Sequence, residues 1–241
     1  MNAKRLLVIG AAGDVGQGIA TVAADSGWRV ALAGRRAGAL DALADRLGRD
    51  KATPFVGSVA DATTAANLRN QVLADLGGLD AVVVAVNAPN VSRPLLSWQP
   101  QELLGVFDSN VLTHFAAAQA FIPCLGASGV FIGIGGGTAD FVLPKAGQLS
   151  MAQAALRMMY RAIAKEAKEG PAVRELMIIS MVNGPAKRAV ADPAWVTDLD
   201  VGRHVQAIIQ SPERFPGPIL ALKGRDQAGQ PDVSLPEVRR A

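Results

Sequence analysis

The chain has 241 residues, enough for one α/β domain with a large hydrophobic core. Half of its residues are apolar, and 24 basic residues stand against 21 acidic ones, for a net charge of +3. The basic residues are scattered and not interleaved with aromatic ones, so we expect no nucleic-acid partner. One cysteine, Cys124, excludes an internal disulfide and a cysteine-based metal cluster. With only His114 and His204 as histidines, we expect no metal site.

The N-terminal segment has some features of a signal peptide. Lys4 and Arg5 precede the apolar run LLVIGAAG, but Asp14 interrupts it and the segment continues into an amphipathic pattern. A first β-strand explains it better. We see no continuous apolar stretch long enough to cross a membrane, and we expect a cytoplasmic protein without a membrane partner.

Apolar runs and helical periodicities alternate along the chain. Strands are predicted over 6–9, 28–33, 52–56, 80–86, 130–134, 176–182 and 218–222. Helices are predicted up to about Ser26, through Leu40, Leu43 and Leu47, and over 61–76, 101–125, 148–168 and 198–210. Such alternation is typical of a doubly wound parallel sheet, a Rossmann-type α/β fold.

The predicted topology is a single domain over residues 1–224. Right-handed crossovers give about seven strands in the order 3-2-1-4-5-6-7, with the seventh at the edge. Residues 225–241 form a polar tail with Pro231 and Pro236. This tail is interpreted as a loosely ordered terminus, with a contact across an oligomer interface as the alternative.

The segment from Leu6 to Ala20 is predicted to form a strand, a glycine turn and a helix. Glycines at a spacing of three suit a sharp turn that a ligand approaches closely, and the helix N-terminus suits a pyrophosphate. The spacing matches the usual dinucleotide fingerprint only loosely. A carboxylate in this turn counts against tight binding unless it points away or caps the helix. The candidate dinucleotide-binding residues here are Gly10, Gly13, Asp14, Val15 and Gly16.

The end of the second predicted strand indicates which dinucleotide binds. An NAD site usually places an acid there for the ribose 2′-hydroxyl, whereas this chain has Arg35 and Arg36. Because guanidinium groups pair well with phosphate, we expect NADP(H) to be favoured over NAD(H). The alternative is that both arginines are a solvated helix start.

Several motifs resemble the short-chain dehydrogenase/reductase family from about Lys4 to Gly224. They are the glycine turn, the Gly34-Arg35-Arg36 end of the second strand, and the sequences VFDSNVLTHF, GVFIGIGG and ILALKG. The resemblance implies an NAD(P)-binding oxidoreductase fold. It also places Ser58 and Val59 at the adenine, with Ser58 standing where the family has an aspartate.

The resemblance further implies a catalytic set of asparagine, serine, tyrosine and lysine. Asn110 is retained. The serine position falls on Gly136, the tyrosine position on Leu149 and the lysine position on Gln153, within LSMAQAAL. In the family the tyrosine exchanges a proton with the substrate, and the lysine lowers its pKa and holds the nicotinamide ribose. Gln153 can still hydrogen-bond a ribose but carries no charge.

Loss of these groups predicts a degenerate oxidoreductase. Removing a positioned general acid alone costs roughly 10²–10⁴ in rate. We therefore expect little ordinary carbonyl or alcohol hydride transfer, and a role as a sensor, regulator or partner that binds a dinucleotide and a small-molecule ligand.

Three alternatives stay open. An active oxidoreductase could use Asp140, Lys145 or His114 for proton transfer; a redox-neutral enzyme could reuse the pocket; a structural partner of an active paralogue would bind no nucleotide. Tyr160, the only tyrosine, lies 11 residues beyond Leu149. At about 1.5 Å per residue it is too distant to replace the lost tyrosine, so it is interpreted as a packing or interface residue.

The predicted helices 101–125 and 148–168 resemble the pair that forms the family's dimer. The second carries more apolar side chains than one buried face needs, among them Met151, Leu156, Met158, Met159 and Tyr160. We expect a homodimer or homotetramer, and the alternative is that this surface belongs to the monomer core.

Overall fold

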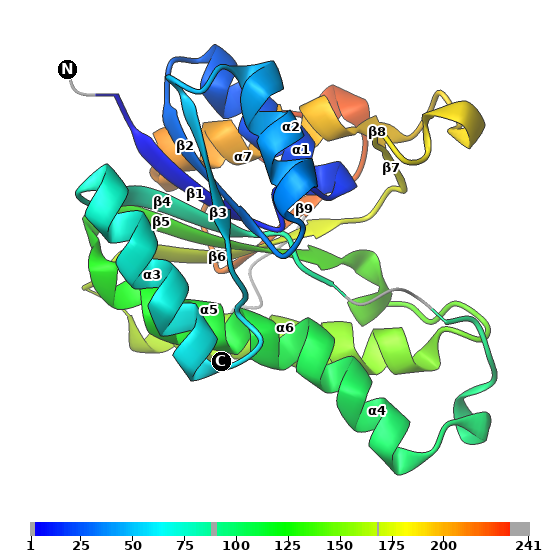
Figure 1. The fold of residues 1–241 in the computed structure, drawn as a ribbon. Helices are drawn as coiled ribbons and strands as arrows, with labels where there is room; N and C mark the ends of the chain where they lie inside the picture. Colours follow the sequence, from blue (N-terminus) through cyan, green and yellow to red (C-terminus); the bar gives the residue numbers. More distant parts are fainter. Residues whose placement is uncertain (1–2, 88–90, 168, 232–241) are drawn as a thin grey trace.

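The computed structural model describes residues 3–87, 91–167 and 169–231. Its centre is a seven-stranded parallel sheet in the order β3-β2-β1-β4-β5-β6-β9 (Figure 1). The strands are β1 (Arg5–Ile9), β2 (Arg29–Gly34), β3 (Ala52–Val56), β4 (Leu79–Val84), β5 (Leu125–Gly136), β6 (Ala172–Ile178) and β9 (Ile219–Leu222). Because β9 is the seventh strand of this sheet, the predicted fold class and strand order are confirmed.

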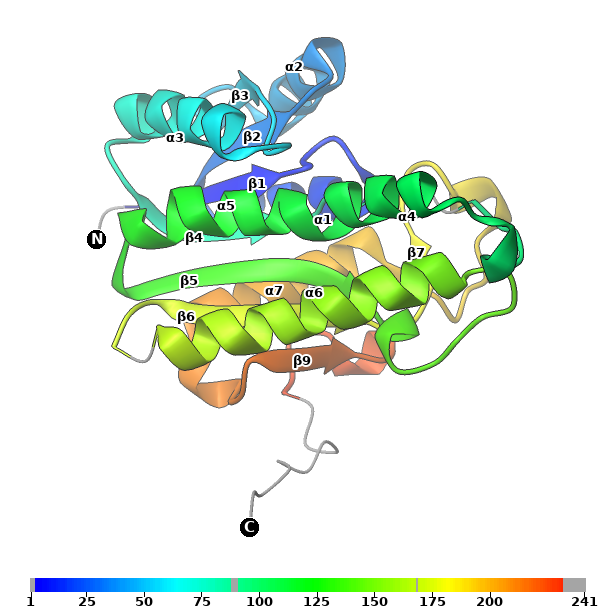
Figure 2. The same cartoon turned by 90° about the horizontal axis from the view of Figure 1, so that it is seen from below.

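Helices cover both faces of the sheet. One layer holds α1 (Asp14–Asp25), α2 (Ala37–Leu47) and α7 (Asp198–Gln210), and the other holds α3 (Ala62–Leu76), α5 (Thr113–Phe121) and α6 (Gly147–Glu166). Figure 2 shows α5 and α6 lying across the second face, with α4 (Pro100–Phe107) extending beyond the sheet edge. None of the helices among the described residues is long and apolar enough to span a membrane.

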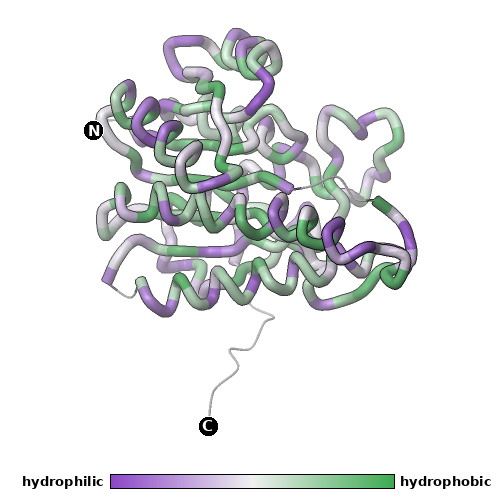
Figure 3. The backbone as a smooth tube through the Cα atoms, turned by 60° about the horizontal axis from the view of Figure 1, so that its bottom comes forward, coloured by the Kyte–Doolittle hydropathy of each residue, from purple (hydrophilic) through white to green (hydrophobic). Residues whose placement is uncertain are grey.

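Side chains along each strand point alternately to the two faces of the sheet, so the domain has one hydrophobic core on each face. In β1, Leu6 and Val8 belong to the core beneath α1, α2 and α7, whereas Leu7 and Ile9 belong to the core beneath α3, α5 and α6. All four are buried, as a parallel strand covered on both faces requires. The helices instead carry both hydrophobic and hydrophilic residues along their length (Figure 3).

The long helix predicted over 101–125 is interrupted. Between α4 and α5 the residues Asp108–Leu112 form a π-helical turn, and Ile122–Cys124 form a 3₁₀ turn. The apolar pattern continues through the break, so periodicity alone could not locate it. A single π-helical turn adds a residue to the helix and re-aims its side chains.

Strand boundaries differ from the prediction at β5 and β6. β6 begins at Ala172 and ends at Ile178, earlier than the predicted 176–182, because Arg174 and Glu175 lie inside the strand. β5 begins at Leu125 because Leu125 pairs with Leu79 of β4, ahead of a register shift to the Ala81–Val130 pair. A short parallel pair, β7 (Val182–Asn183) with β8 (Val196–Thr197), was not predicted.

The start of the polar tail packs on the domain. The Arg225 guanidinium donates to Asp200 at 3.2 Å, and the Gly229 amide donates to His204 Nδ1 at 3.2 Å. These contacts place residues up to about 230 against α7. The predicted tail continues to Ala241, and its residues 232–241 lie outside the described part of the chain.

Candidate functional site

The candidate site lies at the C-terminal edge of the sheet, where β1 turns into α1. The amides of Gly10 and Ala11 both donate to Ala33 O at the end of β2, at 2.9 and 3.1 Å, and the Gly13 amide donates to Gly10 O at 3.0 Å. These bonds fold the turn tightly between β2 and β4. The N-terminus of α1 therefore opens at the switch point of the sheet, where doubly wound folds bind their ligands.

Glycine is required at two points of the turn. Gly10 has a φ of 85°, and a Cβ there would overlap the carbonyl oxygen of Ala85, just beyond β4. A Cβ at Gly16 would overlap Gly10 O. Gly13 precedes α1 as its N-cap, and Val15 packs against the core beneath α1. The turn is therefore packed too closely against neighbouring backbone to admit a Cβ at Gly10 or Gly16.

Asp14 is the first residue of α1 and points toward a segment far along the chain. Its Oδ1 accepts a hydrogen bond from the Ala186 amide at 2.8 Å. A Cβ at Gly184 would overlap the Asp14 side chain, so the backbone there lies directly against it. The carboxylate is therefore neither a helix cap nor turned away to solvent, and its negative charge stays at the positive end of α1.

The other predicted cofactor residues follow β2 and β3. We call this part of the candidate site the adenosine end, because the predicted contacts to the adenine and the 2′-phosphate lie there. Arg35 and Arg36 are exposed at the end of β2, and the Arg36 guanidinium donates to Ala12 O at 3.1 Å, over the glycine turn. Beyond β3, Ser58 Oγ accepts from the Ala60 amide at 3.1 Å, and Val59 is buried. Because β1, β2 and β3 are neighbours, these residues share one edge of the sheet.

We call the part of the candidate site beside the end of β5 and the start of α6 the reacting end. At the predicted serine, tyrosine and lysine positions, this end has no side chain that can exchange a proton with a ligand. Gln153 is buried in α6, and its Oε1 accepts a hydrogen bond from the Gly136 amide at 2.7 Å. Leu149 lies one turn earlier on α6 and is half-buried. Thus the side chain at the lysine position is tied to the backbone at the serine position.

Asn110 lies in the π-helical turn between α4 and α5. It is 1% exposed, and its Nδ2 donates to Val106 O at 2.8 Å. π-Helical turns occur frequently at functional sites, where they direct one side chain inward. The structure thus fixes the orientation of Asn110, the predicted retained member of the catalytic set, which the sequence did not reveal.

Asp140 and Lys145, considered above as substitute acid–base groups, lie on the segment between β5 and α6. Asp140 forms an ion pair with Arg157 of α6. Lys145 is exposed with a φ of 63°, and its carbonyl accepts from the Arg93 amide at 3.0 Å. Asp140 therefore fixes this segment to α6, which competes with a role in proton transfer.

His114 of α5 and Tyr160 of α6 form a buried pair next to the segment that follows β4. His114 Nδ1 and the Tyr160 hydroxyl are 2.9 Å apart, and His114 Nε2 lies 2.8 Å from Val86 O. Burial lowers the pKa of His114 to about 4 and raises that of Tyr160 well above 10. Both groups are neutral at physiological pH, which fits the packing role predicted for Tyr160.

A further buried ionisable group, Glu175 in β6, was not singled out in the sequence. It is 0% exposed, neither carboxylate oxygen has a hydrogen-bond partner among the described residues, and Arg157 Nε lies 3.7 Å away. Burial raises its pKa to about 7, against the lowering effect of the Arg157 charge. The available sequence signal was a lone acid within the apolar end of a strand, ELMII.

The parallel sheet, the glycine turn at its switch point and the helix N-terminus behind that turn define a Rossmann-type dinucleotide-binding fold. A family model described as enoyl-(acyl carrier protein) reductase matches residues 10–192. The chain belongs to the short-chain dehydrogenase/reductase family, a family of oxidoreductases, as its sequence motifs indicated.

Related proteins agree with this assignment. An uncharacterized oxidoreductase of Staphylococcus aureus is 27% identical over 204 residues, which are 81% of this chain and 88% of the relative. A D-threitol dehydrogenase of Mycolicibacterium smegmatis is 30% identical over 57% of this chain and 51% of its own length.

Solved structures share the fold at low sequence identity. A short-chain dehydrogenase/reductase variant from Serratia marcescens superposes with a TM-score of 0.82 at 19% identity, over 92% of this chain and 97% of its own. An alcohol dehydrogenase from Thermococcus sibiricus, complexed with 5-hydroxy-NADP, has a TM-score of 0.78 at 20% identity, over 92% of this chain and 96% of its own.

Proposed function

We propose that this protein is a cytoplasmic, homo-oligomeric NADP(H)-binding member of the family that has lost ordinary hydride-transfer activity and acts as a sensor, regulator or partner. The observation that carries the proposal is the Gln153–Gly136 hydrogen bond beside Leu149. At the reacting end, the side chain at the predicted lysine position is hydrogen-bonded to the backbone at the predicted serine position. The adenosine end, in contrast, has the glycine turn and the two arginines.

The residues present fit a dinucleotide at the adenosine end. The turn has the tight backbone conformation of a dinucleotide-binding turn, because a Cβ at Gly10 or Gly16 would collide with neighbouring backbone, and the Arg36 guanidinium donates to Ala12 O in the same turn. Arg35 and Arg36 would pair with a 2′-phosphate, and Ser58 and Val59 would border the adenine. When bound, the nicotinamide would supply hydride chemistry, but the chain offers Leu149 where a proton donor would be needed.

The proposal predicts a 2′-phosphate-dependent stabilisation. We expect NADPH and NADP to raise the melting temperature by roughly 5–10 °C at about 100 times their dissociation constants. At the same concentrations, NADH and NAD should give a smaller rise. Thermal shift and calorimetric titration with the four nucleotides measure this. No shift with any of them at millimolar concentration would contradict nucleotide binding.

Arg36→Ala tests the source of the preference. We expect it to weaken NADPH binding about tenfold and to leave NADH binding within about twofold, because a charge-assisted hydrogen bond to phosphate is lost. Arg49→Ala, which removes an equal charge from an arginine paired with Asp41 and Asp45, is the matched control. Equal effects of both substitutions would show that only net charge matters.

The loss of activity is tested separately. We expect no turnover of NADPH at ordinary enzyme rates with a panel of ketones and aldehydes, nor of NADP with alcohols. Steady turnover would instead favour an active oxidoreductase with unusual proton-transfer groups.

A further inference from the structure

The loop formed by residues 184–195 connects β7 to β8 and lies beside the N-terminus of α1. In Figure 1 it is the yellow segment beyond β7 and β8. Its two ends are held together because Val182 pairs with Val196 and Asn183 with Thr197. Compact surface loops whose ends lie close together are frequently functional.

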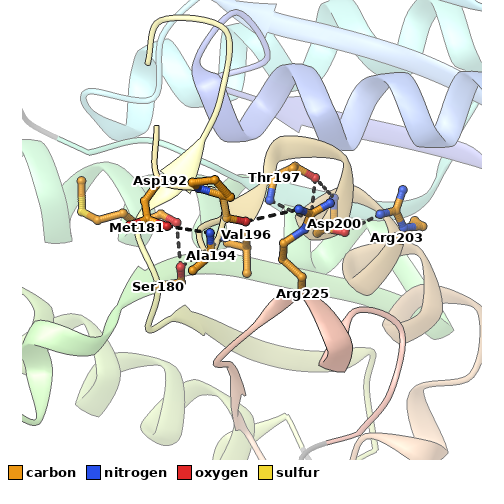
Figure 4. A network of polar contacts seen from close by, with 10 residues as sticks. Ser180, Met181, Asp192, Ala194, Val196, Thr197, Asp200, Arg203 and Arg225 are labelled. Carbon is orange, nitrogen blue, oxygen red and sulfur yellow. Dashed lines mark hydrogen bonds and ion pairs between the residues drawn. The ribbon is translucent and has the colours of Figure 1, made fainter. Parts of the chain in front are cut away.

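A network of polar contacts fixes the ends of this loop. Figure 4 shows Ser180 Oγ accepting from the Val196 amide at 3.2 Å, while Asp200 accepts from the Thr197 hydroxyl at 2.6 Å. Asp200 also pairs with Arg203 and with Arg225, whose Nη1 donates to Pro193 O at 3.3 Å. The ends of the loop are therefore anchored to α7 and to the start of the C-terminal tail.

The middle of the loop is held by two contacts. One is the hydrogen bond from the Ala186 amide to Asp14 Oδ1, at 2.8 Å, with Gly184 packed on the Asp14 side chain. The other is the ion pair of Arg188 with Asp198, at 3.5 Å. Arg188 itself is exposed, so this second contact is screened by solvent.

Asp14 thus places a carboxylate and a strap of backbone at the end of α1 where an anionic ligand would bind. The free amides and dipole at a helix N-terminus attract negative charge, and Asp14 already supplies a carboxylate there. A diphosphate brought to the same place would be repelled by this carboxylate.

We propose that Asp14 and the loop 184–195 form a closed strap over the phosphate-binding end of the crevice, and that a dinucleotide binds only when the Asp14–Ala186 contact opens. This inference rests on the proposed function, which assigns the crevice to a dinucleotide. It makes Asp14 an internal competitor of the ligand and the strap a gate on nucleotide affinity.

Two substitutions separate charge from contact. Asp14→Asn removes the charge and keeps an oxygen that can accept from Ala186, whereas Gly184→Ala keeps the charge and displaces the strap by overlap with Asp14. Asp25→Asn, which removes a charge at the other end of α1, is the matched control. NADPH is the probe, titrated by calorimetry.

We expect Asp14→Asn to bind NADPH about tenfold more tightly than wild type, because a like charge at a partly exposed site is removed. Asp25→Asn should stay within about twofold of wild type. If Asp14→Asn and Asp25→Asn both bind NADPH as wild type does, the proposed competition is overturned.

Opening of the strap is read independently by limited trypsin digestion of the full chain, since Lys187 and Arg188 lie on the strap. We expect Gly184→Ala and Asp14→Ala to be cut there several-fold faster than wild type, and NADPH to accelerate the cut in wild type. Protection of this site by NADPH would overturn the gate, because the strap would then close on the ligand.

The two proposals fail in different ways. If no variant binds NADPH, the proposed function fails, and the digestion of the nucleotide-free variants alone decides whether Asp14 holds the strap. If wild type binds NADPH and the variants are cut no faster than wild type, the strap proposal fails while the proposed function stands.

Discussion

Protonation of the buried Glu175 carboxyl is coupled to the stability of the fold. Glu175 lies in the core between β6 and α6, and burial raises its pKa from 4.5 to about 7. The folded state therefore holds this proton more tightly than the unfolded chain does. Its contribution to stability is present below about pH 4.5 and is lost as the pH rises through about 7, a change of about 3 kcal/mol.

Glu175→Gln keeps the shape of the side chain and removes its titration. We expect the free energy of unfolding of the variant to match that of wild type near pH 4.5 and to exceed it by about 3 kcal/mol near pH 8, measured by urea denaturation. His114 acts in the opposite direction: its pKa is lowered to about 4, so its contribution is lost as the pH falls from about 6.5 through 4. Because His114 is present in both wild type and Glu175→Gln, the difference between their free energies of unfolding reports on Glu175 alone.

The control for this comparison is Glu166→Gln, at the exposed end of α6. Its difference from wild type should be small and should not change with pH. A Glu175→Gln difference that is the same at both ends of the pH range would show that the carboxyl is not the titrating group.

At the scale of elements, β5 is adapted to the polar groups that α6 and β6 bring against it. A Cβ at Gly133 would overlap the Tyr160 hydroxyl, and one at Gly135 would overlap the Glu175 carboxylate. Both glycines lie on the same face of the strand because they are two residues apart. The glycine run thus makes room for the buried polar side chains.

Gly133→Ala tests this fit. We expect a loss of about 3 kcal/mol in the free energy of unfolding, because neither the strand backbone nor the buried tyrosine ring can move away easily. Gly38→Ala is the matched control: it lies in α2 with open space around it, and a gain of about 0.5–1 kcal/mol is expected there. Similar effects of the two substitutions would contradict a close fit at Gly133.

At the scale of the whole molecule, the layer of α4, α5 and α6 leaves large apolar side chains in contact with water. Leu156 and Tyr160 of α6 are buried in the monomer core, but Met151 is 42% and Met158 62% exposed. Exposed large apolar side chains also lie on the neighbouring helices, at Leu104, Leu112 and Phe115. We propose that a second copy of the chain covers this surface, since large apolar patches mark interaction sites.

Met158→Glu should shift the protein toward the monomer in light scattering after size exclusion, because a charge would be buried in the interface. Because Met158 is exposed in the monomer, the unfolding of the isolated monomer should be little changed. Ala42→Glu, on the exposed face of α2, is the control and should leave the assembly intact. A wild-type protein that is already monomeric at micromolar concentration would contradict the proposal.

Much of this architecture could be predicted because it depends on local patterns. The apolar run Leu6–Ile9 needs burial on both faces, and the helical periods of α2 and α6 need one buried face each, so the alternation of elements and the strand order followed from the sequence. The glycine turn was predicted for the same reason, since its conformation depends on residues within one loop.

Other features depend on residues far apart in the sequence. Glu175 was not singled out in the sequence, because nothing near it in the chain shows that Gly135 and Arg157 lie against its carboxylate. The contact of Asp14 with Ala186 spans 172 residues, so the sequence raised the question of where the carboxylate points without an answer.

The sequence by itself determined the Rossmann-type fold and the place of the glycine turn, and it predicted the loss of the serine, tyrosine and lysine, because each depends on a local pattern or a single position. Only the tertiary structure decided that Gln153 is tied to Gly136, that Asp14 holds the loop 184–195 and that Glu175 is buried beside Gly135. The physical reason is that burial and pairing depend on which distant segments the sheet brings together, and that arrangement is a property of the folded chain.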